Sequence, residues 1–152
     1  MIDENAFNVF DLISVILGFV FLWSTLVVTV GLLIPRKKMI AADRKLRFAV
    51  LICARNEERV IRPPVKSILM SSYPKDKYEV IVLADNCTDK TADAARAAGA
   101  TVWEKTIPSS GKGDVLAWGV DKVLERDDFD AIAVFDADNI VSAQWFDAMN
   151  DA

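Results

Sequence analysis

The hydrophobic pattern of the chain changes between residues 34 and 48. From Leu12 to Ile34 the chain carries no charged residue and is apolar on all sides, unlike an amphipathic surface helix. A helix of this length rises about 34 Å and can cross a hydrocarbon core of about 30 Å. The acidic start does not suit a secretory signal peptide, and a buried core helix, the other alternative, is rarely so long. We therefore expect residues 1–38 to be a transmembrane anchor with a basic flank.

After residue 46, short apolar runs alternate with segments whose apolar residues recur at helical spacing. Strands are expected at 47–53, 78–83, 101–104 and 131–135, and helices at 63–71, 89–98 and 114–125, with a last helix after Ser142. Thr88 and Ser142 are candidate N-caps, and Gly99 is a candidate helix stop. The alternation predicts an α/β fold whose parallel sheet is covered on both faces. In such sheets ligands bind at the carboxyl ends of the strands.

The composition excludes several kinds of chemistry. The chain has 152 residues, 53% of them apolar and 26% charged, which suits a globular domain with a membrane segment and not a disordered tail. Because histidine is absent, a His-based triad and a His-rich metal site are excluded. Cys53 and Cys87 are too few for a zinc site or a disulfide framework, and we expect free thiols.

The net charge of −4 conceals an uneven distribution. Residues 36–47 hold six basic side chains and one acidic side chain, whereas residues 48–152 carry a net charge of −6. An acidic globular part argues against nucleic acid as a partner, because that binding needs a basic face. The basic cluster beside the apolar run indicates a bilayer surface, with the C-terminal side in the cytoplasm. We expect an anchor in the cell membrane, a linker at 39–47 and a cytoplasmic domain at 48–152.

Two aspartates follow the last predicted strand. Asp136 and Asp138 are two positions apart, so both carboxylates can reach one point beyond the sheet. Such a pair is unfavourable unless a cation neutralises it, and Mg²⁺ or Mn²⁺ accepts one or two carboxylates and completes its shell with water and phosphate oxygens. The pattern indicates a metal–diphosphate site. The alternative is a solvated loop with acidic turn residues, since a single Asp-x-Asp is a weak match.

Three further polar residues fall near the same edge. Asp85 follows the second strand, where a carboxylate can accept a hydrogen bond from the N–H of a base such as uracil. The alternative is that Asp85 belongs to a loop that caps a helix. Glu57 can accept a hydrogen bond from a ribose hydroxyl. The alternative is that its negative charge only stabilises the positive N-terminal end of a helix. Lys112, between Gly111 and Gly113, offers a point charge for phosphate or lies in an exposed flexible loop. Neither a P-loop nor a Gly-x-Gly-x-x-Gly fingerprint is present.

The sequence resembles the family 2 glycosyltransferases, which have a Rossmann-like GT-A nucleotide-sugar fold. The stretches that carry the resemblance are AVLICARNEE, EVIVLADNCTDKTADAARAAGA, GKGDVLAWG and VFDADN, within about residues 48–146. The chain departs from many members at Asn86, where they carry a second Asp, and at Cys53, where they carry Pro. Both departures affect fine positioning more than the assignment.

The resemblance implies a role for each candidate residue. Asp85 would read the uracil ring, and Lys112 would approach the diphosphate. The Asp-x-Asp stretch would hold Mn²⁺ or Mg²⁺ and the ribose–diphosphate. Ala54 and Glu57 match the loop that borders the nucleoside. The nucleotide-sugar site implied is therefore Ala54, Glu57, Asp85, Lys112 and Asp136, and the metal ligands implied are Asp136 and Asp138.

The resemblance also implies an enzyme that uses a UDP-sugar to build a polysaccharide or a glycolipid on a saccharide or lipid acceptor. In the family, the catalytic base and a Gln-x-x-Arg-Trp segment lie well downstream of the Asp-x-Asp motif, and here only residues 139–152 follow it. We assign no catalytic residue and expect the chain to supply donor binding only, weakly or not at all by itself. Two alternatives stay open: a membrane-anchored interaction module, and a phosphatase of the haloacid dehalogenase type, whose Asp-x-Asp motif lies on its first strand.

Overall fold

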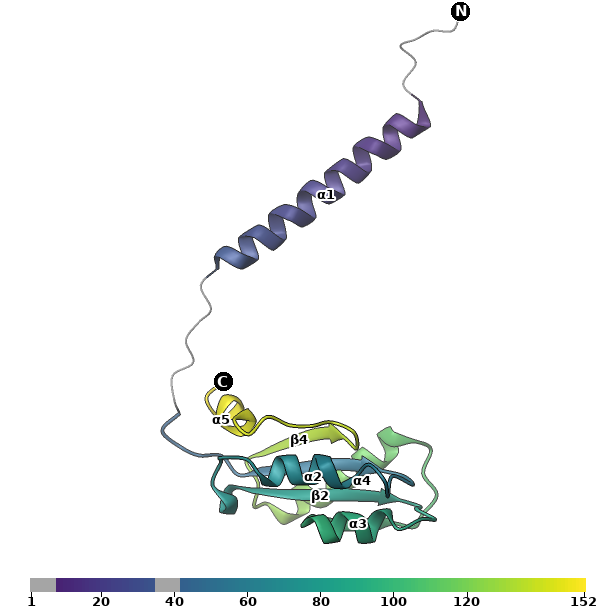
Figure 1. Cartoon of the computed structure of the whole chain (residues 1–152), viewed down its shortest axis with the longest axis vertical. Coiled ribbons are helices and arrows are strands. Elements are labelled where there is room, and N and C mark those ends of the chain that lie inside the picture. Colours follow the sequence, from purple (N-terminus) through teal and green to yellow (C-terminus); the bar gives the residue numbers. More distant parts are fainter. Residues whose placement is uncertain (1–7, 35–41) are drawn as a thin grey trace, which may run out of the picture. The chain divides into compact units, whose positions relative to one another are not determined.

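The computed structural model describes residues 8–34 and 42–152, which belong to two separate units (Figure 1). The first unit contains helix α1 (Val9–Leu33), and the second is an α/β domain. Residues 35–41, which hold the basic flank and the start of the expected linker, lie outside the described residues. The expected boundary at residue 38 lies in this segment, and both boundaries, at residues 38 and 47, remain predictions.

Helix α1 suits an apolar environment along its whole length. It has 25 residues, none of them buried, and apolar side chains dominate it from end to end. At its start the Asn8 side chain accepts N–H groups of the first turn, and the Asp11 carboxylate accepts the N–H of Asn8. The hydroxyls inside the helix donate to carbonyls of the preceding turn, as seen at Ser14, Thr25 and Thr29. The helix is therefore long and apolar enough to cross a membrane.

Four parallel strands form the sheet of the domain (Figure 1). They are β1 (Phe48–Ala54), β2 (Tyr78–Asp85), β3 (Thr101–Lys105) and β4 (Ala131–Asp136), in the order β3-β2-β1-β4. Between successive strands the chain passes through α2 (Arg62–Leu69), α3 (Thr91–Ala98) and α4 (Lys112–Arg126). A 3₁₀ helix, η1 (Lys75–Lys77), precedes β2, and α5 (Trp145–Asn150) follows β4. The predicted α/β fold with a parallel sheet is confirmed.

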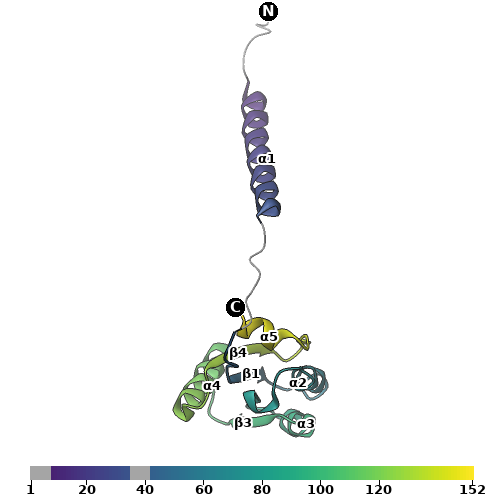
Figure 2. The same ribbon diagram turned by 90° about the vertical axis from the view of Figure 1, so that its left-hand side faces the viewer.

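Strand β1 is buried on both faces, as its continuous apolar sequence predicts. Val50 and Ile52 belong to one core cluster, together with residues of α2, α3 and α5. Ala49 and Leu51 belong to the opposite cluster, together with residues of α4. Figure 2 shows α2 and α3 on one side of the sheet and α4 on the other. Because successive side chains of a strand point to opposite faces, both layers are anchored on this one central strand.

The predicted helix starts are less accurate than the predicted strands. Helix α3 begins at Thr91 and not at Asp89, and Thr88 is not its N-cap. The N–H of Thr88 instead donates to the Asn56 side chain at 2.8 Å, in the loop after β1. At the other end of α3 the prediction is confirmed, because Gly99 has a left-handed φ of +105° that favours glycine.

The prediction that Ser142 caps the last helix is wrong. Helix α5 begins at Trp145, and Gln144 occupies its N-cap position without a side-chain cap. The Ser142 hydroxyl accepts the N–H of Gln144 at 3.4 Å and so belongs to the turn before the helix. The Ser142 hydroxyl therefore accepts a backbone N–H, as a capping side chain does, but it lies too early in the chain to accept the unpaired N–H groups of the first turn of α5.

Candidate functional site

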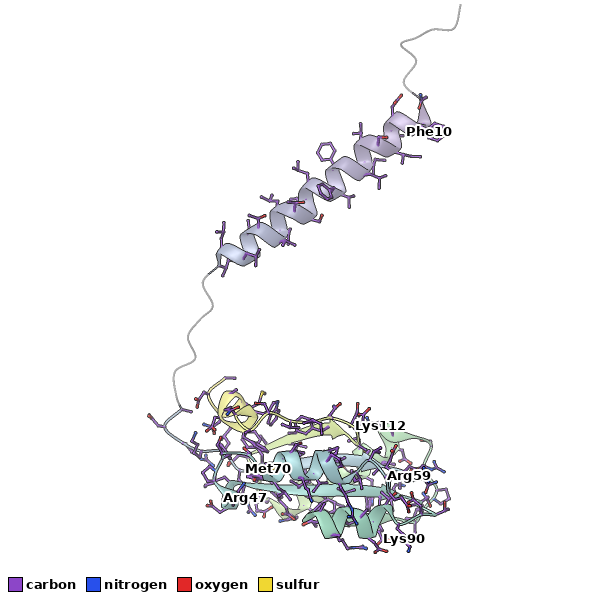
Figure 3. The ribbon with its side chains drawn as sticks, viewed as in Figure 1. Phe10, Arg47, Arg59, Met70, Lys90 and Lys112 are labelled. Atoms are coloured by element: carbon purple, nitrogen blue, oxygen red, sulfur yellow. The ribbon has the colours of Figure 1, made fainter. Side chains whose placement is uncertain are left out.

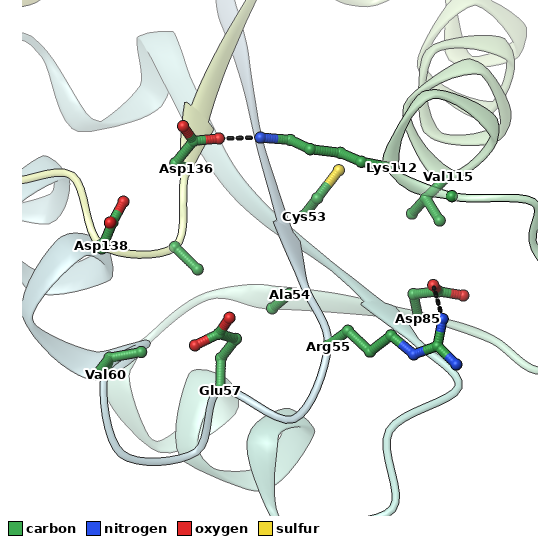
Figure 4. Close-up of a pocket in the computed structure, with 12 residues that line it drawn as sticks. Cys53, Ala54, Arg55, Glu57, Val60, Asp85, Lys112, Val115, Asp136 and Asp138 are labelled. Carbon is green, nitrogen blue, oxygen red and sulfur yellow. Dashed lines mark hydrogen bonds and ion pairs between the residues drawn. The ribbon is translucent and has the colours of Figure 1, made fainter.

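A cavity of about 580 Å³ opens at the carboxyl edge of the sheet (Figure 4). It lies where the chain, having placed β2 and β3 on one side of β1, returns to add β4 on the other side. Such a reversal of strand order leaves a crevice between neighbouring strand ends, where α/β proteins bind ligands. All the candidate residues from the sequence line this cavity: Ala54, Glu57, Asp85, Lys112, Asp136 and Asp138.

Asp136 and Asp138 form the wall of the cavity next to β4. Asp136 is the last residue of β4 and pairs in register with Cys53 of β1, and Asp138 lies in the turn that follows. Both side chains are exposed. The ammonium of Lys112 donates to the Asp136 carboxylate (Figure 4), and this hydrogen bond raises the pKa of Lys112. One cation and two carboxylates therefore share this wall.

The two carboxylates fit a cation that takes only part of its ligands from the protein. Within residues 8–34 and 42–152, no three His, Cys, Asp or Glu side chains converge as a closed metal site would require. Mg²⁺ and Mn²⁺ bind instead through one or two carboxylates and complete an octahedral shell with water and phosphate oxygens. Asp136 and Asp138, exposed in the cavity, suit this second kind of binding.

Helix α4 brings Lys112 to the cavity. We expected a helix that begins at Asp114 and leaves Lys112 in a loop, and this is wrong, because Lys112 is the first residue of α4. Gly111 precedes it with a φ of +147°, a conformation that glycine adopts at no steric cost. A helix N-terminus has unpaired N–H groups and a partial positive charge, so it adds to the attraction of Lys112 for an anion.

Asp85 lies at the end of β2, away from Asp136, and is only 5% exposed. Ser109 Oγ lies 2.8 Å from its Oδ1 and 2.7 Å from its Oδ2, and Asn86 Nδ2 donates to Oδ1 at 2.8 Å. Burial alone raises the pKa of this carboxyl, but hydrogen bonds from Ser109 and Asn86 and the charge of Arg55 bring it below its usual range. Asp85 is therefore ionised at neutral pH and acts only as an acceptor.

The loops after β1 and β2 are joined by hydrogen bonds from backbone groups to side chains. Thr91 Oγ1 accepts the N–H of Glu57 at 2.7 Å, and the Asp89 carboxylate accepts the N–H of Glu58 at 3.2 Å. Thr91 is fully buried and donates its hydroxyl to Asp89, so both acceptors are held in place. The result is that the backbone of Glu57 is fixed at the rim of the cavity.

The cavity is also lined by residues that were not among the candidates, and these include Cys53, Arg55 and Val60. Arg55 directly follows β1, and its Nη1 lies 3.6 Å from Asp85 Oδ2. Its position after a strand that ends at the ligand-binding edge is a signal that the sequence does contain. Cys53 lies at the end of β1, and partial burial raises the pKa of its thiol.

Comparison with known proteins identifies a family for the chain. Residues 46–151 match the family described as "Glycosyltransferase like family 2". The probable glycosyltransferase YdaM of Bacillus subtilis (strain 168) is 37% identical over 98 residues, which are 61% of this chain and 23% of that protein. The chain spans less than a quarter of the length of the curated relatives it matches. The match gives no support to the phosphatase alternative, and Asp136 ends the fourth strand of the sheet and not the first.

Two examples of solved structures with a similar fold are a mannosyltransferase and a synthase. The mannosyltransferase PcManGT from Pyrobaculum calidifontis, in complex with GDP-Man and Mn²⁺, has a TM-score of 0.60 at 23% identity, over 76% of this chain and 36% of that one. Glucosyl-3-phosphoglycerate synthase from Mycobacterium tuberculosis, in complex with Mg²⁺ and uridine diphosphate, has a TM-score of 0.52 at 28% identity, over 66% of this chain and 36% of that one. These likenesses confirm the GT-A type of α/β fold.

Proposed function

Because the chain belongs to the glycosyltransferase-like family 2, we propose that it is the donor-binding part of a membrane-anchored glycosyltransferase. The donor is a UDP-sugar bound with Mg²⁺ or Mn²⁺. The acceptor is a saccharide or a lipid, as in the synthesis of a polysaccharide or a glycolipid at the cytoplasmic face of the membrane. The observation that carries this proposal is that one cavity gathers Asp85, Lys112, Asp136 and Asp138.

The diphosphate end of the donor belongs beside β4 and α4. Sugar transfer requires that the charge of the leaving diphosphate be neutralised. Lys112 and the N-terminus of α4 supply fixed positive charge for this purpose. Asp136 and Asp138 are the residues that would hold the divalent cation, which when bound acts as a Lewis acid toward the diphosphate. Asp136 also borders the ribose–diphosphate.

The nucleoside end of the donor belongs beside β1 and β2. Asp85 is ionised and fixed by its neighbours, so it can accept the ring N–H of uracil. Glu57 accepts a ribose hydroxyl, from a backbone position that Thr91 fixes. Ala54, the buried last residue of β1, borders the nucleoside between Asp85 and Glu57.

Transfer also requires a base that takes the proton of the acceptor hydroxyl. Asp136 and Asp138 are assigned to the cation and Asp85 to the nucleoside, so we assign this role to no residue of the chain. The proposal is therefore that the chain by itself binds the donor weakly and does not transfer its sugar.

Calorimetric titration of the full chain in detergent with UDP, with and without Mn²⁺, tests the proposal. We expect heat of binding that depends on Mn²⁺ and is lost in Asp136→Ala. The matched control is Asp121→Ala, which removes an exposed carboxylate from the outer part of α4. Absence of heat with the folded wild-type chain, or equal heat with Asp136→Ala, would contradict the proposal and favour an interaction module without donor binding.

A further inference from the structure

Arg55 and Asp85 form an ion pair in the cavity, and the sequence analysis gave Arg55 no role. We propose that Arg55, together with Asp85, determines which base the site accepts. The pair takes a base with a ring N–H next to a carbonyl oxygen, as in uracil and guanine, and rejects cytosine and adenine. This inference rests on the proposed function, because it assumes that the cavity holds a nucleoside diphosphate.

The first step is to count the acceptor positions that Asp85 still has. A carboxylate offers about four lone-pair directions for hydrogen bonds. In the structure it accepts one hydrogen bond from the Ser109 hydroxyl, shared between its two oxygens, and one from the Asn86 amide. These donors fix the orientation of the carboxylate and leave it able to accept from a ligand. Because Asn86 bonds to Oδ1, the free capacity lies mainly on Oδ2, the oxygen that faces Arg55.

The second step concerns the freedom of Arg55. Its side chain is 61% exposed, and the 3.6 Å between Nη1 and Asp85 Oδ2 is too long for a hydrogen bond. Because the guanidinium is exposed and is not hydrogen-bonded to Asp85, it can turn toward a ligand at small cost. Figure 4 shows the guanidinium next to Asp85, whereas the Lys112 ammonium is bound to Asp136 on another wall. Arg55 is thus a donor placed beside an acceptor.

The third step matches this pattern to the bases. Uracil presents a ring N–H between two carbonyl oxygens, and guanine presents a ring N–H beside one carbonyl oxygen. Asp85 can accept the N–H while Arg55 donates to the neighbouring oxygen. A cytosine or adenine held in the same position presents an unprotonated ring nitrogen to Asp85 and an amino group to Arg55. An acceptor would then face an acceptor, and a donor would face a donor. A site built for particular hydrogen bonds rejects analogues that cannot make them, because its own polar groups are left unpaired.

The experiment compares UDP, GDP, CDP and ADP by calorimetry with Mn²⁺, for the wild-type full chain, Arg55→Met and Arg59→Met. Arg59 is the matched control: it is an exposed arginine of the same loop that does not line the cavity (Figure 3). We expect the wild-type chain to bind UDP or GDP at least about tenfold more tightly than CDP and ADP. Arg55→Met should reduce that ratio severalfold while keeping CDP affinity, because only the contact of Asp85 with the ring N–H then remains, and Arg59→Met should leave the ratio unchanged.

The possible results separate this inference from the proposed function. Equal wild-type affinity for the four nucleotides, or an equal loss for all four in Arg55→Met, overturns the base-reading role and leaves the glycosyltransferase assignment standing. A preference for GDP over UDP that depends on Arg55 supports the inference and contradicts the UDP-sugar donor. No binding of any nucleotide by the folded chain overturns both. Thermal unfolding of Arg55→Met at the wild-type temperature verifies that the variant is folded.

Discussion

Asp85 is a nearly buried carboxylate whose charge is maintained by its neighbours. Its hydrogen bonds to Ser109 and Asn86 outweigh the effect of burial, so its pKa lies below the usual range. A carboxyl group with a lowered pKa in the folded state stabilises the fold above its unfolded pKa of about 4. That contribution is lost as the pH falls through the lower, folded pKa.

We therefore predict that Asp85→Asn destabilises the domain at pH 7 by about 1–3 kcal/mol, because the hydroxyl and amide donors lose a charged acceptor. The difference from the wild-type chain should shrink as the pH falls below about 4. Urea denaturation at a series of pH values measures both effects. Ser109→Ala should move the acid limb of the wild-type profile to higher pH, since it removes one cause of the lowered pKa. A pH-independent cost of Asp85→Asn would contradict this account.

At this scale the sequence predicts some site residues and not others. Asp85 and Asp136 could be predicted because each ends an apolar run, and the end of a buried strand is easy to locate. Arg55 and Ser109 were missed because the direction of a loop side chain depends on local backbone conformation. Asn86, which directs the loop after β2, has a left-handed φ of +45° that apolar patterning does not reveal. The left-handed Asn56, with φ +57°, has the same effect after β1.

The elements place the charges by their packing. Helix α4 carries Lys112 at its start and lies against the sheet through Gly119, where an added Cβ would come within 2.3 Å of Leu83 Cδ1. The strands were predicted closely because their apolar runs are continuous, and the crossovers followed from their alternation with helices. The start of α4 was predicted two residues too late, because no side chain caps this helix and only the conformation of Gly111 marks where it begins.

Gly119→Ala is expected to destabilise the domain by about 1–3 kcal/mol, because the methyl group forces α4 away from β2. Gly113→Ala in the same helix is the control. A Cβ there has no atom within 4 Å, and alanine favours the helix over glycine by about 1 kcal/mol. Thermal unfolding of the two variants measures the contrast. Equal stability of both would show that the close packing of α4 is not what limits this position.

The whole molecule joins two units of opposite chemistry, an apolar helix and an acidic domain. Helix α1 has no buried residue, so no packing inside its own unit accounts for its apolar surface. The proposed bilayer anchor would account for it, and the basic residues that follow at 36–38 predict the orientation, with the domain in the cytoplasm.

We predict that a membrane-impermeant maleimide leaves the native cysteines unlabelled in intact cells and labels them after permeabilisation. Cys87 is the reporter, because the raised thiol pKa of Cys53 slows its reaction. Asn5→Cys, before the helix, should be labelled in intact cells and serves as the control. Labelling of Cys87 in intact cells would reverse the proposed orientation.

The central claim is that Asp85, Lys112 and the aspartates after β4 form one site for a nucleoside diphosphate and its cation. Paramagnetic broadening of amide NMR signals by Mn²⁺, recorded for the full chain with and without UDP, tests it most directly. We predict that UDP strengthens the broadening around residues 136–138 and 111–112, and that UDP shifts the signals around Asp85. The claim would be contradicted if the broadening were the same with and without UDP. It would also be contradicted if the broadening centred on other acidic residues, such as Asp128 and Asp130.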